Sequence, residues 1–148
     1  MTSSNEPSDL TDPERAVTLV DFLLARIAED EAKARAATPS PWLPHDQGWV
    51  DAGGEWIICA PYHGLDISDQ DAEHVTRWQP ARVLAECDAR RRIVELHGFD
   101  FAVPIDADSS WEEDTVCRAD QAEWPCDTLR LLALPYADHP EYDEAWRP

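Results

Sequence analysis

The sequence is short of basic residues, and above all of lysine. Lys33 is the single lysine among 148 residues, and the 12 Lys and Arg face 31 Asp and Glu, which gives a formal net charge of −19 at pH 7. Nucleic-acid binding depends on clustered basic side chains that displace counterions from phosphates. The one basic run, RRR at 90–92, would spread its side chains about 100° apart on a helix. We therefore expect no direct binding of nucleic acid, and for the same reason no attraction to an anionic membrane.

Long apolar runs are missing as well. No stretch approaches the roughly 20 apolar residues that span a bilayer. Residues 1–12 are polar and acidic, and they lack the basic and apolar regions of a secretion signal. These absences predict a cytoplasmic protein. In that compartment the 4 cysteines are more typical of free thiols or metal ligands than of disulfides.

The chain does contain enough apolar material for one core. With 43% hydrophobic residues and 7 Trp, wholesale disorder is excluded, whereas 12 Pro against 5 Gly predict many loops. Chains of roughly 100–200 residues usually form one domain. We predict a disordered tail at 1–10 and a single domain over 11–148.

Apolar spacing predicts a small three-helix core. Apolar residues recur at helical steps from Val17 to Ile27, which predicts a first helix over 13–37. A second helical segment over 71–97 is interrupted at Pro80, because proline cannot continue a helix from within, and Gly98 is its expected C-cap.

The end of the chain predicts a third, shorter helix. It begins at Asp127 or Thr128, and Pro135 kinks or ends it. Beyond it we expect a turn at His139 and Pro140 and a short helix holding Tyr142 and Trp146. These two aromatic side chains are predicted to fold back over the helices and close the core, in preference to forming a recognition surface.

Two further segments complete the expected fold. Residues 49–50 and 56–58 flank Gly53 and Gly54, a pattern typical of a short β-hairpin. Residues 99–125 are acidic and irregular, and so long a loop is unusual inside a compact domain unless something organises it. The predicted fold class is therefore mainly α, with a three-helix core, one short β-hairpin and a long acidic loop that a metal ion would organise.

Four side chains at the borders of this loop and within it have the chemistry of zinc ligands. They are an imidazole, a carboxylate and two thiols: His97, Cys117, Asp120 and Cys126. Such donors can complete a tetrahedral Zn²⁺ shell, and the Cys-x₂-Asp spacing is that of a Cys-x₂-Cys knuckle with oxygen in place of one sulfur. The alternative is that these thiols are metal-free members of a small core. Cys87 and Cys59, on apolar segments, are assigned to the core.

Three segments of the chain resemble a known family: LVDFLLARIAEDEAKARAATPSPW from Leu19, DAEHVTRWQPARVLAECDARRRIVELH from Asp71, and WPCDTLRLLALPYADHPEYDEAWRP from Trp124. The chain is similar to an uncharacterised family of small actinobacterial and actinophage proteins, of which ALPYADHPEY is a characteristic segment. Many members carry a Cys-x₂-Cys pair before the Trp-Pro-Cys element. This sequence has Cys117 and Asp120 there, so it departs from that pattern at the second ligand. The resemblance implies an architecture and no mechanism.

For function, the sequence favours a small acidic binding or adaptor protein with a structural zinc site and a basic protein partner. One alternative is a phage- or mobile-element-encoded DNA mimic that inhibits a nucleic-acid-binding protein. Another is a metal-dependent hydrolase, which would need an open coordination position beside a pocket. No catalytic motif is present, and His74 and His139 stand in no catalytic context, so no catalytic residue is assigned. The sequence leaves the oligomeric state open.

Overall fold

A computed structural model of the chain describes residues 18–58, 67–101 and 115–148. Some predictions concern residues outside these ranges. They are the disordered tail at 1–10, the first residues of the first helix at 13–17 and the place of Cys59 in the core. Four α-helices dominate the described part, so the mainly α prediction is confirmed. The elements in chain order are α1 (Leu19–Ala36), β1 (Trp42–His45), β2 (Trp49–Ala52), β3 (Glu55–Ile58), α2 (Asp69–Arg77), α3 (Pro80–Leu96), β4 (Phe99–Phe101), β5 (Thr115–Cys117) and α4 (Asp127–Ala133).

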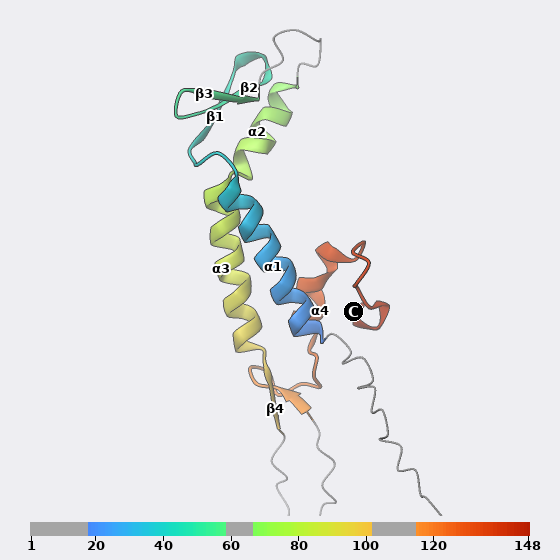
Figure 1. Cartoon of the computed structure of the whole chain (residues 1–148). Helices are drawn as coiled ribbons and strands as arrows, with labels where there is room; N and C mark the ends of the chain where they lie inside the picture. The colour runs from blue at the N-terminus through green and yellow to red at the C-terminus, as the bar shows by residue number, and fades with distance from the viewer. Residues whose placement is uncertain (1–17, 59–66, 102–114) are drawn as a thin grey trace, which may run out of the picture.

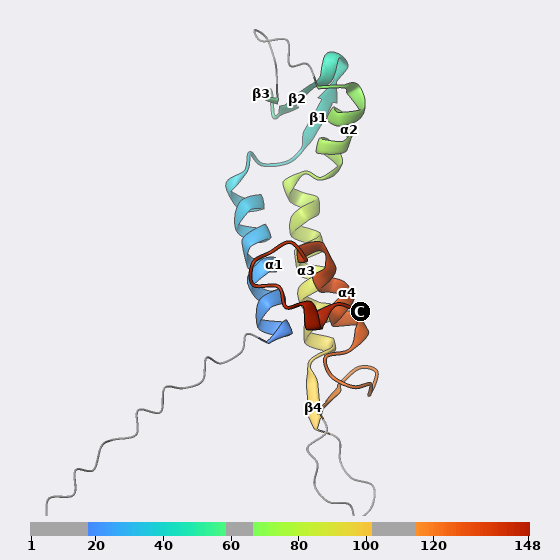
Figure 2. The same ribbon diagram turned by 90° about the vertical axis from the view of Figure 1, so that its right-hand side faces the viewer.

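The molecule is built on a pair of antiparallel helices, α1 and α3, that lie side by side along its length (Figures 1 and 2). Thr18, in an extended conformation, is the N-cap of α1, and its hydroxyl accepts the Asp21 N–H at 3.1 Å. The helix therefore begins at Leu19, and the predicted start at residue 13 is wrong. Its apolar stripe, with Phe22 at 1% exposure, packs against Cys87 and Val94 of α3. The assignment of Cys87 to the core is thereby confirmed. Within the described residues, no helix combines the length and the apolar character needed to cross a bilayer.

A small antiparallel sheet caps one end of this helix pair (Figure 1). The predicted hairpin is confirmed as β2 and β3, which turn at Gly53 and Gly54 with φ of 64° and 91°. A third strand, β1, was not predicted, because its residues WLPH are mostly exposed and show no alternation. Proline is tolerated there since β1 is an edge strand.

The second helical segment is broken at Pro80 as predicted, but its first part differs in two ways. Ser68 caps α2 through a capping box with Asp71, so the helix begins at Asp69 and not at 71. The helix α2 packs on β1 and β2, with Ala72 buried, and not in the α1–α3 core. The core helices are α1, α3 and α4.

The expected C-cap at Gly98 is wrong. His97 is the cap, with φ of −94°, and Gly98 does not adopt a positive φ. The chain instead passes straight into β4, which pairs with β5 so that Phe99 lies opposite Cys117. The expectation of an irregular stretch from 99 to 125 is therefore wrong at 99–101 and 115–117, which form strands, whereas residues 118–125 form no helix or strand. Residues 102–114, including Trp111, lie outside the described part.

The C-terminal segment wraps across α1 (Figure 2). After α4 the chain makes a 3-10 turn over Leu134–Tyr136, so the predicted end of the helix at Pro135 is confirmed. The Tyr142 N–H donates to the His139 carbonyl at 2.9 Å, which confirms the turn there. The rings of Tyr142 and Trp146 lie 6.0 and 5.0 Å from that of Phe22 and close the core as predicted, although Trp146 ends a 3-10 turn and not an α-helix.

Candidate metal centre

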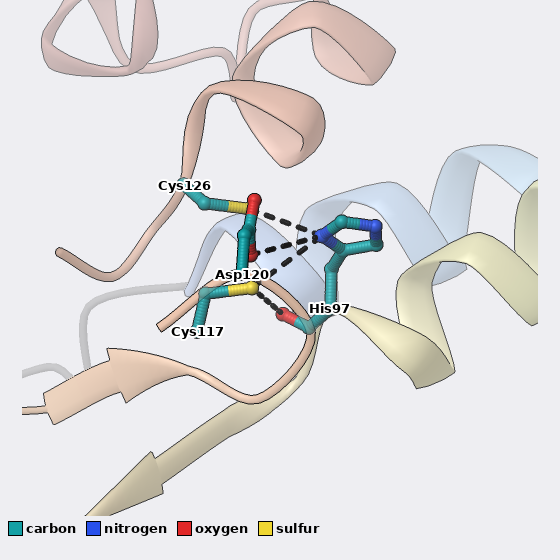
Figure 3. Close-up of side chains that lie close together, drawn as sticks. All are labelled: His97, Cys117, Asp120 and Cys126. Atoms are coloured by element: carbon teal, nitrogen blue, oxygen red, sulfur yellow. Dashed lines mark hydrogen bonds and ion pairs between the residues drawn. The ribbon is translucent and has the colours of Figure 1, made fainter. Parts of the chain in front are cut away.

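All four predicted ligands meet at the end of the helix pair that is opposite the three-stranded sheet (Figures 1 and 3). His97 caps α3, Cys117 ends β5, Asp120 lies in the turn that follows, and Cys126 precedes α4. One ligand atom from each side chain lies within 4.8 Å of every other. Because these residues come from separate elements, the cluster is a product of the tertiary fold.

The three distances from the His97 ring nitrogen are those expected between neighbouring ligands of a tetrahedral zinc ion. His97 Nδ1 lies 3.4 Å from Cys117 Sγ, 3.5 Å from Cys126 Sγ and 3.5 Å from Asp120 Oδ1. Bonds of 2.0–2.3 Å to zinc place neighbouring donors about 3.3–3.8 Å apart. A single ring nitrogen cannot donate its proton to three acceptors at once. The cluster could hold a metal ion, and a cation at its centre would satisfy every donor.

The backbone around Cys117 explains how two ligands point to the same place. The Cys117 N–H donates to Ala122 O at 2.8 Å, and the Gln121 N–H donates back to Cys117 O at 2.9 Å. Gln121 closes this turn with a φ of 55°, a conformation uncommon for residues other than glycine. We call residues 117–122 the knuckle. Its tight turn brings the Asp120 side chain onto the same side as the Cys117 thiol.

The knuckle is fastened to α3 through the backbone. The Arg118 N–H donates to the Gly98 carbonyl at 2.8 Å, directly after His97. This bond continues the β4–β5 pairing one residue further and sets the separation between the imidazole and the Cys117 thiol. This bond could not be predicted from the sequence, because Gly98 and Arg118 are far apart in the chain.

Burial divides the cluster into a closed side and an open side. Cys117 and Cys126 are 0% and 2% exposed, whereas the Asp120 side chain is 42% exposed. Burial, and next a hydrogen bond to Asp120, raise the pKa of the Cys117 thiol. The same hydrogen bond is the main cause that lowers the pKa of Asp120. In the metal-free cluster the proton therefore stays on the Cys117 sulfur, and a metal must displace it.

The remaining candidate side chains lie elsewhere. His139 contacts Arg26 on α1, and His74 packs near Trp78 on α2. Sequence reasoning missed the structural contribution of Gln121, since a positive φ at a non-glycine residue has no reliable sequence signal. All four predicted ligands are brought together, and no other group of three or more metal-ligating side chains forms within the described ranges.

A family model matches residues 16–148. The chain belongs to DUF6221, a family of unknown function. The match in this DUF6221 protein includes all four residues of the cluster and the C-terminal segment that wraps α1. No curated protein and no solved structure matches the chain. The actinobacterial and phage origin that the sequence suggested stays a prediction.

Proposed function

We propose that this DUF6221 protein is a small acidic binding or adaptor protein. A structural Zn²⁺ would stabilise the end of the molecule that lies opposite the three-stranded sheet. His97, Cys117, Asp120 and Cys126 are the proposed ligands. The observation that carries the proposal is the convergence of their four donor atoms, all within 4.8 Å of one another. Reduced thiols are required for such a site, which fits the cytoplasmic location that we expect.

The donor set favours zinc among the common metals. Two thiolates and an imidazole disfavour Mg²⁺ and Ca²⁺, which prefer oxygen ligands. Four protein donors fill a tetrahedral shell, as in structural zinc sites, whereas catalytic sites leave one position to water. A cavity of about 660 Å³ next to the cluster is lined by none of the four ligands. These features support a structural role over hydrolysis.

The charge distribution supports a basic protein partner. Many arginines are already held in ion pairs within the chain, among them Arg91 with Glu31 at 2.9 Å and Arg82 with Glu86 at 2.8 Å. Their charge is thus neutralised locally, and the surplus of the −19 net charge is left to act outward. A surface of this kind accelerates encounter with a basic protein and repels nucleic acid.

Metal analysis tests the zinc site. Protein purified after expression with zinc is expected to contain about one Zn²⁺ per chain. Replacing Zn²⁺ by Co²⁺ is expected to give the intense visible absorption of a tetrahedral thiolate site. Cys126→Ser is expected to lose the metal and to lower the melting temperature by several degrees.

The matched control is Cys87→Ser, which alters a buried thiol that is no ligand. This variant is expected to keep its zinc even if it is less stable. Zinc retained in Cys126→Ser, or lost equally in both variants, would refute the proposed ligand set.

The partner proposal has its own test. The immobilised protein is expected to retain a basic protein from a cell lysate at low salt and to release it at high salt, because the screening length falls from about 10 Å at 0.1 M to 3 Å at 1 M. Association that is independent of salt would contradict an acidic recognition surface.

A further inference from the structure

A pocket of about 660 Å³ lies beside the metal cluster. Val20 and Leu24 of α1 and Val94 of α3 line it, together with the rings of Phe99 and Trp124. Its floor is the margin of the hydrophobic core, because Val94 is buried and Val20, Leu24 and Trp124 pack against the core cluster. The volume is within the range of pockets that bind small molecules or single side chains.

The metal cluster positions much of the pocket wall. Gly98 directly follows the ligand His97, Arg118 directly follows Cys117, and Trp124 stands two residues before Cys126. The Phe99 and Trp124 rings meet edge to face, with centroids 5.7 Å apart. Loss of the metal would release these three wall segments together. The state of the metal site and the shape of the pocket are therefore linked.

The charges around the pocket favour a cation. Asp21, Glu95 and Asp100 line it, and Arg91 is neutralised by Glu31 at 2.9 Å. In the described part of the chain the exposed Glu95 carboxylate makes no ion pair. Arg118 is the remaining lining cation against Asp21 and Glu95, so the acids are in excess even when Asp100 is left out of the comparison. Aromatic faces attract cations as well.

We infer that this pocket binds a cationic amphipathic group, the bulky apolar side chain of a basic partner together with an adjacent ammonium or guanidinium. The inference rests on the proposed function, for which it names the anchor point. The apolar part would fill the space over Val20 and Leu24, and the positive charge would face Glu95. The metal contributes by holding the Trp124 and Phe99 wall in place.

Three naphthalene probes that differ in charge test the inference on the zinc-loaded full chain: naphthylmethylamine, naphthylacetate and naphthylmethanol. Amide chemical shifts in NMR titrations give the affinity and the location. The amine is expected to bind at least about fivefold more tightly than the acetate at low salt. Added salt is expected to reduce this difference in affinity. Equal affinity of the three probes, or tighter binding of the acetate, would overturn the assignment of a cationic ligand.

Two variants locate the site. A Cβ on Gly98 would meet its nearest neighbours at 3.5 Å or more, so Gly98→Leu is expected to fold and to fill the pocket. It should abolish binding of the amine. Glu95→Gln should weaken the amine about two- to fivefold, as for one exposed ion pair, and leave the alcohol unchanged. Glu73→Gln, the same change on α2, is the control and should alter neither. Amine binding that survives Gly98→Leu would refute the pocket as the site.

Chelation of the metal separates this inference from the proposed function. Removal of zinc is expected to weaken amine binding, because Gly98, Arg118 and Trp124 lose their anchors. If zinc and salt-dependent capture of a basic protein are both confirmed but Gly98→Leu captures it as well as the parent protein does, the pocket inference alone fails. If the purified protein retains no zinc, the proposed metal site is refuted, whichever way the pocket variants behave.

Discussion

Arg26 links α1 to the C-terminal segment of the chain. Its side chain is 7% exposed, and its guanidinium donates to Glu29 at 2.9 Å and to Glu141 at 3.0 Å. The same group contacts the His139 ring and lies 5.3 Å from the centre of the Phe22 ring. A buried guanidinium needs such partners, because an unpaired buried charge is costly. Arg26 therefore fixes the C-terminal segment to α1.

We predict that Arg26→Met lowers the free energy of unfolding by about 1–3 kcal/mol, because it removes several hydrogen bonds to a charged group while keeping much of the apolar volume. Urea denaturation measures the change. Arg92→Met is the control, since Arg92 and its partner Asp88 are 73% and 61% exposed, and it should change stability by no more than about 0.5 kcal/mol. Equal effects of the two substitutions would contradict the role of Arg26.

Residue chemistry was also what made the ligands predictable. The sequence showed the residue types of the four ligands and their positions, with His97 and Cys126 at the borders of a long loop and Cys117 and Asp120 within it. The bond from Arg118 to Gly98 and the positive φ of Gln121 could not be predicted from it, since both are set by chain segments that meet only in the folded state. The sequence therefore indicated which side chains form the cluster but not how the backbone aims them.

At the scale of elements, the long helices and the glycine hairpin were predictable and the short strands were not. The helices α1 and α3 show apolar periodicity within their own sequence, and Pro80 in the first turn of α3 marks where that helix begins. The strand β1 and the pair β4–β5 span only three or four residues each. Pairs this short are stabilised by their neighbours, so their local sequence holds little information.

Two glycines near the sheet distinguish the stability cost of a close steric contact from the cost of an unusual backbone conformation. Both have a positive φ, 70° at Gly48 and 64° at Gly53. A Cβ on Gly48 would lie 1.8 Å from the Ile67 carbonyl oxygen, whereas one on Gly53 would meet nothing within 4 Å. We predict that Gly53→Ala costs about 1–2 kcal/mol of stability from backbone conformation alone. Gly48→Ala should cost clearly more, because the backbone of Ile67 must also move. Thermal unfolding of the two variants checks this order, and a smaller cost at Gly48 would contradict the close approach.

The hydrogen bond from Tyr136 to α1 predicts that the stability of the fold falls at alkaline pH. Tyr136 donates to Asp30 at 2.7 Å, and burial together with Asp30 raises the pKa of Tyr136 to about 12. In the unfolded chain the phenol ionises near pH 10. The contribution of Tyr136 is therefore fully present below pH 10 and is lost as the pH rises towards 12. Denaturation measured across this window should show falling stability in the parent protein and a shallower fall in Tyr136→Phe. Parallel curves would refute the predicted coupling.

For the molecule as a whole, the helix pair α1–α3 separates two differently stabilised ends. The sheet end is held by packing of β2 on α2, with Val50 and Ala72 buried. The opposite end contains the main core cluster, and Cys117 and Cys126 belong both to that core and to the proposed zinc site. The two buried thiols are thus shared between apolar packing and metal binding, and the metal should stabilise one end in preference to the other.

We predict that chelation of zinc loosens only the knuckle end. Amide hydrogen exchange should accelerate at Cys117 and Gln121, whose N–H groups close the knuckle, and through α4, which begins after Cys126. Exchange in the β2–β3 hairpin should stay unchanged, because its pairing does not involve the ligands. A chelated Cys126→Ser sample is the control, since it has no proposed site left to empty and should show no further change. Uniform acceleration along the chain would mean that the metal stabilises the fold globally and that the two ends unfold as one cooperative unit.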